Sequence, residues 1–404
     1  MHWVIRLSQH DGKENRCVDF SLSSLQTDIA EAATKISAAF PMSYWRAKDR
    51  TEEYPWEFVK PFAEGGWLGL IIPQTYGGMG LGIAEAAVFL NRVAASGAGM
   101  SGASALHFYI FPPMPIVRHG SESMKKRFLP DVAAGKLLSA FGITEPNAGS
   151  DTSRIETRAV KQGDHWLISG QKLWTTNAQN APKILVLTRT SPRDPAKPLA
   201  GLTLFFTDLD RRYCAIRRID KLGRAAVDSN EVFIKNLPAR DDEIVGELGK
   251  GFEYLLDGFN PERIVLAAEA IGIGRAALQL ATRYAAERIV FERPIGANQA
   301  IAHPLAKAWA HLESTELMVF KAASQYDSGQ SCAKAANAAK YLAAEAAFDA
   351  CDAALQTLGG LGYAKEFDVE RLWREVRLYK IAPISQEMVL NFLSQKALNL
   401  PKSY

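Results

Sequence analysis

The chain has 404 residues, of which 48% are hydrophobic and 23% are charged, so it is long enough to fold around two or three cores. Its 47 basic and 44 acidic side chains are mixed along the sequence and leave a formal charge of only +3. That balance argues against a surface for nucleic acid or for a membrane. We therefore expect a small soluble ligand as the main partner.

Neither the cysteines nor the apolar segments indicate export. Cys17, Cys214, Cys332 and Cys351 have no metal-binding or disulfide spacing, as is usual in a reducing cytosol. The sequence shows no continuous apolar run of about 18 residues, the length that spans a bilayer, and its first residues lack the apolar stretch of a signal peptide. We predict a cytoplasmic protein without a membrane span.

The pattern of apolar residues changes twice along the chain. A polar segment at residues 1–20 predicts a flexible extension, and spacings of three and four residues predict a helical domain over residues 21–136. Short β-branched and aromatic runs parted by Gly, Asp and Pro predict a β-domain over residues 137–248. Alanine-rich helical periodicity then returns over residues 249–404, and its wide apolar arc predicts a helix bundle with a subunit interface.

Two polar strings follow predicted strands of the β-domain. The first, Gly142 to Asp151, is rich in Gly, Ser, Thr and Asn, and such a loop can bring backbone N–H groups close to a phosphate or to a flavin edge. Spacing alone favours an ordinary turn.

The second string runs from Gly170 to Ala178. Its Trp174 and Thr176 are two residues apart on a strand, so we expect them on the same side, where one could cover a planar ring and the other could hydrogen-bond its edge. A strand tryptophan is more often a core residue.

A third glycine-rich motif, Gly272-Ile273-Gly274, lies inside a helical pattern and follows no strand. It therefore fails the context test for a dinucleotide-binding turn, and we interpret it as a site of close helix packing.

Ordered matches over nearly the whole chain resemble the acyl-CoA dehydrogenase family. The strings that carry the resemblance are GWLGLIIPQTYGGMGLG, FGITEPNAGSD, GQKLWTTNA, KLGRAAVDSNEVF, GKGFEYLLDGFNPERIVLAAEAIG, ERIVFERPIGANQAIAH and QTLGGLGYAKEFDVERLWREVRL. The resemblance implies an α+β multidomain fold with an N-terminal helical domain, a central β-barrel-like domain and a C-terminal four-helix bundle. It also implies FAD as cofactor and a homodimer or homotetramer.

By the same resemblance, FAD lies between the β-domain and the bundle, with Thr176 beside flavin N5. The implied FAD contacts of this subunit are Phe141, Thr144, Ser150, Trp174, Thr176 and Ser385. The implied contacts made by the neighbouring subunit with the pyrophosphate and adenine half are Arg288, Phe291, Gln299, Gln356, Gly359 and Gly360.

The position of the catalytic base is the main departure from the family pattern. Many members carry a glutamate near the C-terminus, but alignment on Ser385 places Ala382 at that position. A smaller branch, which includes isovaleryl- and long-chain-type dehydrogenases, carries the base on a bundle helix directly before an arginine. Phe259-Asn260-Pro261-Glu262-Arg263 matches that pattern, so Glu262 is the candidate base, with Arg263 ordering the site or contacting the CoA portion.

Glu262 also has a purely structural interpretation. Asn260 resembles a helix N-cap and Pro261 a first helical residue. Glu262 would then complement the helix dipole, which would lower its pKa and work against a role as base.

The resemblance also suggests how the substrate is bound. The implied substrate contacts are Tyr109, Ser150, Asn260, Arg263 and Ala382. The backbone N–H of Ala382 would polarise the thioester carbonyl, although Pro383 restricts its backbone. His107, among apolar residues, is interpreted as structural, and the remaining histidines have no metal spacing, so we expect no metal.

Two classes of function are compatible with the sequence. The first is α,β-dehydrogenation of an acyl-CoA in fatty acid or amino acid catabolism, with electrons passing to an electron-transfer flavoprotein. The second is a catalytically degenerate flavin-binding subunit. An acyl-CoA oxidase and a dehydrogenase of carrier-protein-bound acyl groups also stay open, whereas a nitroalkane oxidase is disfavoured because it expects an aspartate where Ala382 stands.

Overall fold

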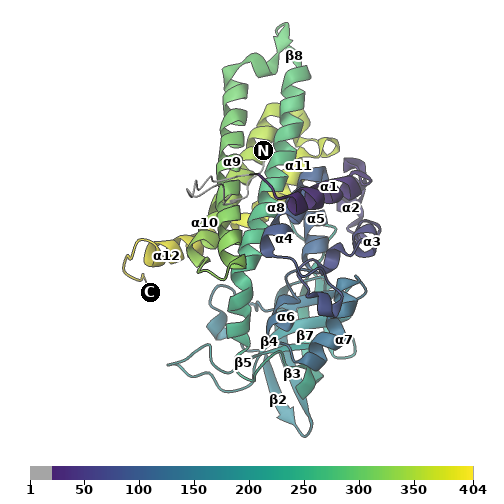
Figure 1. Ribbon diagram of the computed structural model, residues 1–404, viewed down its shortest axis with the longest axis vertical. Coiled ribbons are helices and arrows are strands. Elements are labelled where there is room, and N and C mark those ends of the chain that lie inside the picture. The colour runs from purple at the N-terminus through teal and green to yellow at the C-terminus, as the bar shows by residue number, and fades with distance from the viewer. Residues whose placement is uncertain (1–20, 404) are drawn as a thin grey trace, which may run out of the picture. The chain divides into compact units, whose positions relative to one another are not determined.

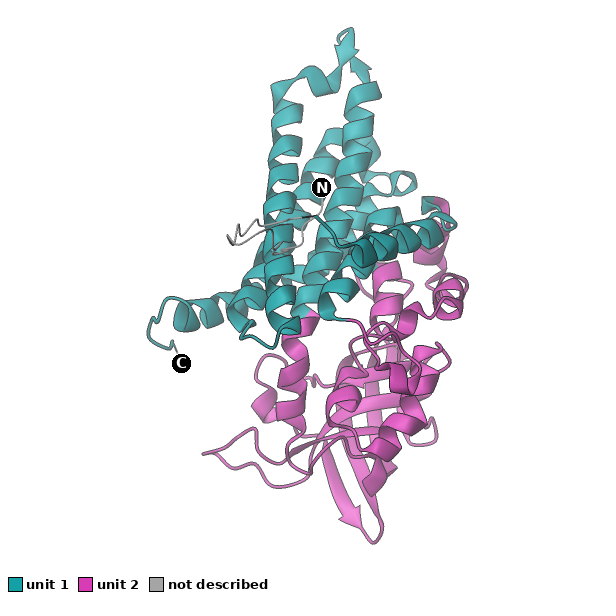
Figure 2. Cartoon of the chain, viewed as in Figure 1, with its two compact units in different colours: residues 1–42, 82–100, 263–404 teal, residues 43–81, 101–262 magenta. Residues whose placement is uncertain are grey.

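The computed structural model describes residues 21–403. The chain divides into two compact units (Figure 2). The first unit comprises residues 1–42, 82–100 and 263–404, and the second unit comprises residues 43–81 and 101–262. The predicted flexible extension at residues 1–20 and Cys17 lie outside the described residues. Cys214 and Cys351 are buried free thiols, and Cys332 is buried as well.

The first unit is helical (Figure 1). Its elements are α1 (Ser24–Ala38), α4 (Ile83–Val93), most of α8 (Gly251–Glu287), the hairpin of β8 (Ile289–Val290) and β9 (Arg293–Pro294), α9 (Gln299–Asp327), α10 (Ala333–Leu358), α11 (Val369–Val376) and α12 (Gln386–Lys396).

Small side chains allow these helices to pack closely. A stripe of alanines spaced by three and four residues on α10 is fully buried. A Cβ atom added to Gly274 of α8 would lie 3.1 Å from Ala347 Cα, and one added to Gly272 would lie 2.3 Å from Asn91 O. The interpretation of Gly272-Ile273-Gly274 as a helix-packing motif is therefore confirmed.

The second unit combines helices with a mixed sheet (Figure 1). Its helices are most of α2 (Met42–Thr51), α3 (Trp56–Glu64), most of α5 (Gly99–His107), α6 (Met114–His119), α7 (Glu122–Ala133) and the first part of α8. Its strands are β1 (Ser139–Gly142), β2 (Arg158–Gln162), β3 (His165–Thr176), β4 (Lys183–Arg189), β5 (Leu202–Asp208), β6 (Cys214–Arg218) and β7 (Ser229–Arg240).

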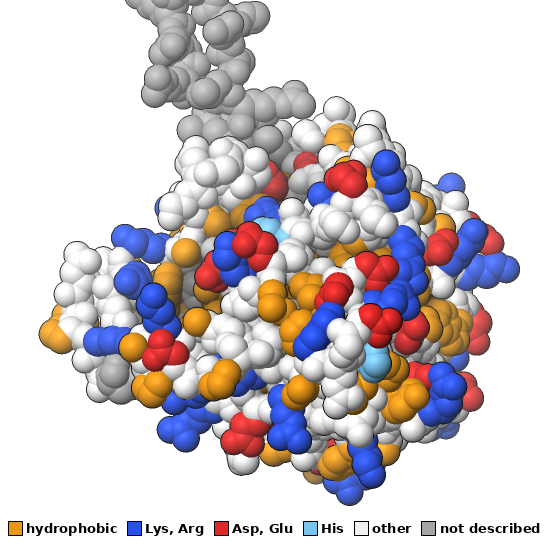
Figure 3. Space-filling view, turned by 90° about the horizontal axis from the view of Figure 1, so that it is seen from below, with side chains coloured by type: hydrophobic (Ala, Val, Ile, Leu, Met, Phe, Trp, Pro, Cys, Tyr) orange, Lys and Arg blue, Asp and Glu red, His pale blue; other side chains and the backbone are white. Residues whose placement is uncertain are grey.

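The sheet curls back on itself. Its strands follow the order β1-β4-β2-β3-β7-β6, with β5 paired to β4, and β1 pairs with β3 as well as with β4. The predicted order of a helical domain, a barrel-like β-domain and a helical bundle is confirmed. On the face drawn in Figure 3, basic and acidic side chains are interspersed with apolar ones.

Helix α8 corrects two expectations. It begins at Gly251, so Asn260 and Pro261 lie inside the helix and Asn260 is not an N-cap. An 18-residue window of α8 is also long and apolar enough to cross a membrane by length and composition, although a few polar residues interrupt its apolar run. Because 83% of that window is buried within the protein, packing accounts for its apolar character.

Candidate functional site

The two polar strings of the second unit lie side by side. Strand β1 ends at Gly142 and pairs with β3 so that Phe141 stands opposite Thr176. Beyond the end of β1, the Leu173 N–H donates a hydrogen bond of 2.8 Å to Thr144 O. Phe141, Thr144 and Thr176 are thus brought together by pairing between segments that are about 30 residues apart in the chain.

A buried ion pair supports the first string. Lys172 Nζ donates to Ile143 O at 3.0 Å and to Glu145 Oε1 at 2.8 Å. The Glu145 carboxylate also accepts the N–H groups of Glu156, at 2.8 Å, and Thr157, at 3.0 Å. The four hydrogen bonds hold the first string to β3 and to the segment before β2.

The pKa values of this pair reflect its burial. Burial lowers the pKa of Lys172 to about 8, and the charge of Glu145 opposes that shift. Burial acts to raise the pKa of Glu145, but the Lys172 charge and the Glu156 N–H outweigh it, so this pKa is lowered. The pair was not predicted; its only signal in the sequence is a Glu and a Lys in two strings that each adjoin apolar strands.

Trp174 differs from both expectations for it. The β3–β7 register shifts between Lys172 and Thr175, and Trp174 has a φ of 59°. This bulge breaks the alternation from which Trp174 and Thr176 were expected on the same side. Trp174 is 52% exposed and therefore not a core residue, whereas Thr176 is buried. The exposed ring of Trp174 is available to a ligand.

A buried arginine lies against Thr176. Arg224 Nη2 donates to Thr176 Oγ1 at 3.3 Å and to Ser229 Oγ at 2.8 Å. Lys221 Nζ donates to the Arg224 carbonyl at 2.8 Å. Burial, together with the charges of Arg224 and Arg218, lowers the pKa of Lys221 to about 7. Arg224 has no predicted role, because its contact with Thr176 depends on strand pairing.

Aromatic residues pack near Phe141 in the second unit. The Phe111 and Phe141 rings meet edge to face with centroids 5.1 Å apart, and a Cβ added to Gly258 of α8 would lie 3.4 Å from Phe111. Tyr109 is fully buried with its hydroxyl 3.5 Å from Gly135 O, and burial raises its pKa. Tyr109 therefore offers no exposed surface in this structure, and its contact with the substrate stays a prediction.

Glu262 and Asn260 lie within α8 and are partly exposed. The first turn of the helix, where the dipole stabilises anions, is at Gly251 and not at Pro261. The interpretation of Glu262 as a helix-dipole residue is therefore wrong. Arg263, the next residue of α8, begins the part of this helix that belongs to the first unit.

Six of the predicted cofactor residues lie at one end of the first unit. Helices α9 and α10 pack against each other and are joined only by residues 328–332, so they are antiparallel. The start of α9 therefore lies beside the end of α10. The residues at this end are Arg288 and Phe291 on the hairpin, Gln299 at the start of α9, and Gln356, Gly359 and Gly360 at the end of α10.

All six of these residues are exposed. Phe291 is 94% exposed at a hairpin tip, where it and Glu292 have φ values of 50° and 65°. Gly359 ends α10 with a φ of 59°, a conformation that favours glycine. This glycine is therefore explained by the helix end alone.

The segment after α11 engages the backbone of Ala382. Its N–H donates to Leu378 O at 2.9 Å, so the donor that was expected to polarise a thioester is engaged within the chain. Ser385 Oγ accepts the Met388 N–H at 3.4 Å and caps α12. Lys340 Nζ binds Ile384 O at 2.6 Å and holds the segment to α10.

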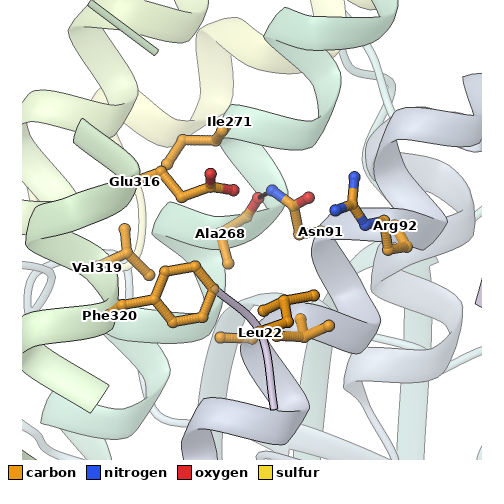
Figure 4. Close-up of a pocket in the computed structure, with 10 residues that line it drawn as sticks. Leu22, Asn91, Arg92, Ala268, Ile271, Glu316, Val319 and Phe320 are labelled. Atoms are coloured by element: carbon orange, nitrogen blue, oxygen red, sulfur yellow. Dashed lines mark hydrogen bonds between the residues drawn. The ribbon is translucent and has the colours of Figure 1, made fainter. Parts of the chain in front are cut away.

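A small cavity in the first unit is distinct from all these positions (Figure 4). It has about 10 Å³ of room, enough for one water molecule at most. Asn91 Nδ2 donates across it to Ala268 O at 2.9 Å. The lining residues labelled in Figure 4 are Leu22, Asn91, Arg92, Ala268, Ile271, Glu316, Val319 and Phe320. The cavity cannot hold a cofactor. Within residues 21–403, no three His, Cys, Asp or Glu side chains gather in a metal-binding arrangement.

Comparison with known proteins identifies the family. Models of the N-terminal, middle and C-terminal domains of acyl-CoA dehydrogenases match residues 23–136, 140–237 and 249–398. The chain is 38% identical over 382 residues to the acyl-CoA dehydrogenase FadE12 of Mycobacterium tuberculosis, covering 93% of this chain and 96% of that protein.

Solved structures agree with this match. The structure of glutaryl-coenzyme A dehydrogenase in complex with glutaryl-CoA superposes with a TM-score of 0.90 at 28% identity, covering 96% of this chain and 98% of that one. A chain solved in work on the electron transferring flavoprotein of Acidaminococcus fermentans has a TM-score of 0.89 at 27% identity, covering 95% and 100%. The chain belongs to the acyl-CoA dehydrogenase family, a family of FAD-dependent enzymes that oxidise carbon–carbon single bonds.

Proposed function

We propose that this protein binds FAD and oxidises the α,β carbon–carbon bond of an acyl-CoA thioester to the 2-enoyl-CoA, with Glu262 as the base. The observation that carries the assignment of the base is the position of Glu262 inside α8, directly before Arg263, in a chain whose C-terminal counterpart, Ala382, has no carboxylate.

Glu262 removes the proton from the α-carbon in this proposal. The electron pair of that C–H bond forms the new double bond, while the β-carbon loses a hydride. When bound, FAD supplies the acceptor for this hydride at N5. A substrate that excludes water from the partly exposed carboxylate would raise its pKa towards the working pH, and no helix N-terminus opposes that shift.

The strand ends of the second unit suit a flavin chemically. Thr144 and Thr176 offer hydroxyl groups beside paired backbone, and the exposed Trp174 ring offers a flat apolar surface. Phe141 and Ser150 complete the set of proposed contacts in this unit. In the first unit, Ser385 is the corresponding proposed contact of the same subunit. We propose that the exposed residues at the hairpin end serve the cofactor of a second subunit.

Self-association has a physical basis in that hairpin. Ile289, Val290 and Phe291 are 55%, 37% and 94% exposed, and contiguous apolar residues of this kind mark interaction surfaces. A homodimer or homotetramer would cover them. We further propose cytoplasmic location and an electron-transfer flavoprotein as the electron acceptor; the likeness to the chain from the Acidaminococcus fermentans study supports this choice.

One observation favours a second candidate function, a catalytically degenerate flavin-binding subunit. The Ala382 N–H is engaged with Leu378 O, and the loss of one donor that stabilises a developing oxyanion costs about 100-fold or more in rate. A substrate that cannot displace this bond would be bound without being oxidised.

An anaerobic panel of acyl-CoA thioesters tests both candidates. The protein is saturated with FAD, mixed with short, branched, aromatic and long acyl-CoAs, and followed by bleaching of the flavin absorbance. With the best substrate, Glu262→Gln is expected to lower the rate by about 100-fold to 10,000-fold, whereas Glu253→Gln, an exposed glutamate of the same helix, leaves it unchanged. Equal rates for the wild type and Glu262→Gln would refute the base assignment. FAD binding without bleaching by any thioester would favour the degenerate subunit.

A further inference from the structure

Arg224 bridges two paired strands beneath Thr176. Thr176 of β3 and Ser229 of β7 are directly opposite each other in the antiparallel register, and the Arg224 guanidinium donates to both hydroxyl oxygens through Nη2. Arg224, Thr176 and Ser229 are 8%, 7% and 2% exposed.

The backbone of Arg224 is held in an unfavourable conformation. Its φ is 58°, a left-handed conformation that costs about 1 kcal/mol or more for a residue other than glycine. Lys221 Nζ donates to the Arg224 carbonyl, and Arg218 Nη2 donates to the Ala225 carbonyl at 2.7 Å. The side chains of Lys221 and Arg218 therefore hold the turn that carries Arg224.

The direction of the Arg224 bond determines the role of the Thr176 hydroxyl. A guanidinium only donates hydrogen bonds, whereas a hydroxyl has one proton and two acceptor positions. Because Thr176 Oγ1 accepts from Arg224, its own proton must point to another acceptor. Arg224 thus leaves the Thr176 proton to point away from the guanidinium, towards an acceptor.

Charged groups of both signs lie around this site. Lys221 lies near Arg218 and Arg224 and near the carboxylates of Asp228 and Glu52. Glu52 pairs with Arg218 at 3.1 Å. Asp228 accepts from Gln179 N–H and from the side-chain amide of Asn180, at 3.0 Å and 2.9 Å, and from that of Asn230.

We propose that Arg224 is a positioning residue for the flavin: it orients the Thr176 hydroxyl towards the flavin edge, and its charge stabilises the reduced, anionic flavin. The proposal rests on the proposed function, in which Thr176 lies beside flavin N5. It predicts that Arg224 raises the reduction potential of the bound flavin through a residue that it contacts directly.

The test compares variants by the potential and the absorption spectrum of the bound flavin. Arg224→Met removes both the donor and the charge, Arg224→Gln keeps a donor without the charge, and Arg212→Met is the control because Arg212 is an exposed arginine of the same unit. We expect Arg224→Met to lower the potential, to change the flavin spectrum and to weaken FAD binding on the order of 10-fold. Arg224→Gln should lower the potential but keep the wild-type spectrum. Arg212→Met should match the wild type.

A double variant tests whether Arg224 acts through Thr176. If it does, adding Arg224→Met to Thr176→Val will change the spectrum no further than Thr176→Val alone, while the charge-dependent loss of potential persists. Thermal unfolding verifies that each variant is folded. If Arg224→Met does not fold, the potential and spectrum of Arg224→Gln decide the test. Wild-type potential and spectrum in both Arg224 variants would overturn the proposal while leaving the proposed function intact. Failure of the wild type to bind FAD would overturn both.

Discussion

Replacement of Lys172 by methionine should destabilise the protein more than any surface change in the same domain. Lys172 and Glu145 have side chains that are 0% and 7% exposed. Methionine fills a similar volume but leaves the carboxylate without its cation. Breaking a buried ion pair from one side costs about 3–5 kcal/mol.

The contacts of Glu145 set the expected value within that range. The N–H groups of Glu156 and Thr157 still donate to the carboxylate after the substitution, and hydrogen bonds to charged groups contribute about 1.5–3 kcal/mol each. The charge that remains on Glu145 is thus partly stabilised. We therefore expect Lys172→Met to lower the free energy of unfolding by about 3 kcal/mol, the lower end of that range. This corresponds to a change of about 100-fold or more in the unfolding equilibrium.

Urea unfolding at a fixed FAD concentration measures this loss. Lys161→Met is the matched control, because Lys161 pairs with Asp241 in the same domain with side chains that are 36% and 65% exposed, and it should cost less than about 1 kcal/mol. A cycle with Glu145→Gln should give a coupling energy above about 1 kcal/mol. Equal destabilisation by Lys172→Met and Lys161→Met would refute the argument that the buried pair supports the first string.

Three further outcomes follow from particular contacts. Burial and the nearby charges of Arg224 and Arg218 lower the pKa of Lys221 from its usual value of 10.5 to about 7. The folded protein therefore binds fewer protons than the unfolded chain between these values, and wild-type stability should rise with pH across that window. In unfolding measurements across that window, Lys221→Met should lack this rise, and parallel profiles would contradict the assignment. Gly272→Ala should cost about 1–3 kcal/mol by overpacking, because its Cβ would meet Asn91 O at 2.3 Å. Gly258→Ala on the same helix, with its nearest contact at 3.4 Å, should be neutral or stabilising, and equal unfolding midpoints for the two variants would disprove this packing. Phe291→Ser should reduce self-association and FAD retention in sedimentation and ultrafiltration assays without altering the unfolding of the separated subunit, since Phe291 is 94% exposed; an unchanged oligomer would count against the hairpin as an interface.

The local sequence pattern predicted the secondary structure correctly where it depends on contacts between residues that are near in sequence or on a regular spacing of apolar residues. The alanine spacing of α10 and the β-branched runs of β3 to β5 carry their own secondary structure. The sequence pattern also distinguished the helix-packing pair Gly272 and Gly274 from a nucleotide-binding turn, because no strand precedes it.

Local signals failed where tertiary packing outweighed them. Asn260-Pro261 carries the features of a helix start, yet α8 begins at Gly251 and continues through Pro261, since burial of its apolar face outweighs one lost backbone hydrogen bond. The position of Trp174 depends on a bulge in the β3–β7 pairing, which alternation within one strand cannot reveal.

The sequence by itself determined the class of the protein, the order of its helical and β segments and the identity of the residues with suitable chemistry, because these depend on composition, periodicity and ordered motifs. Only the tertiary structure decided which of those residues meet. Strand pairing places Phe141 opposite Thr176 and Arg224 against Thr176, and it buries Lys172 with Glu145. Each of these contacts joins segments that are distant in the chain, and their energies depend on burial that no local pattern encodes.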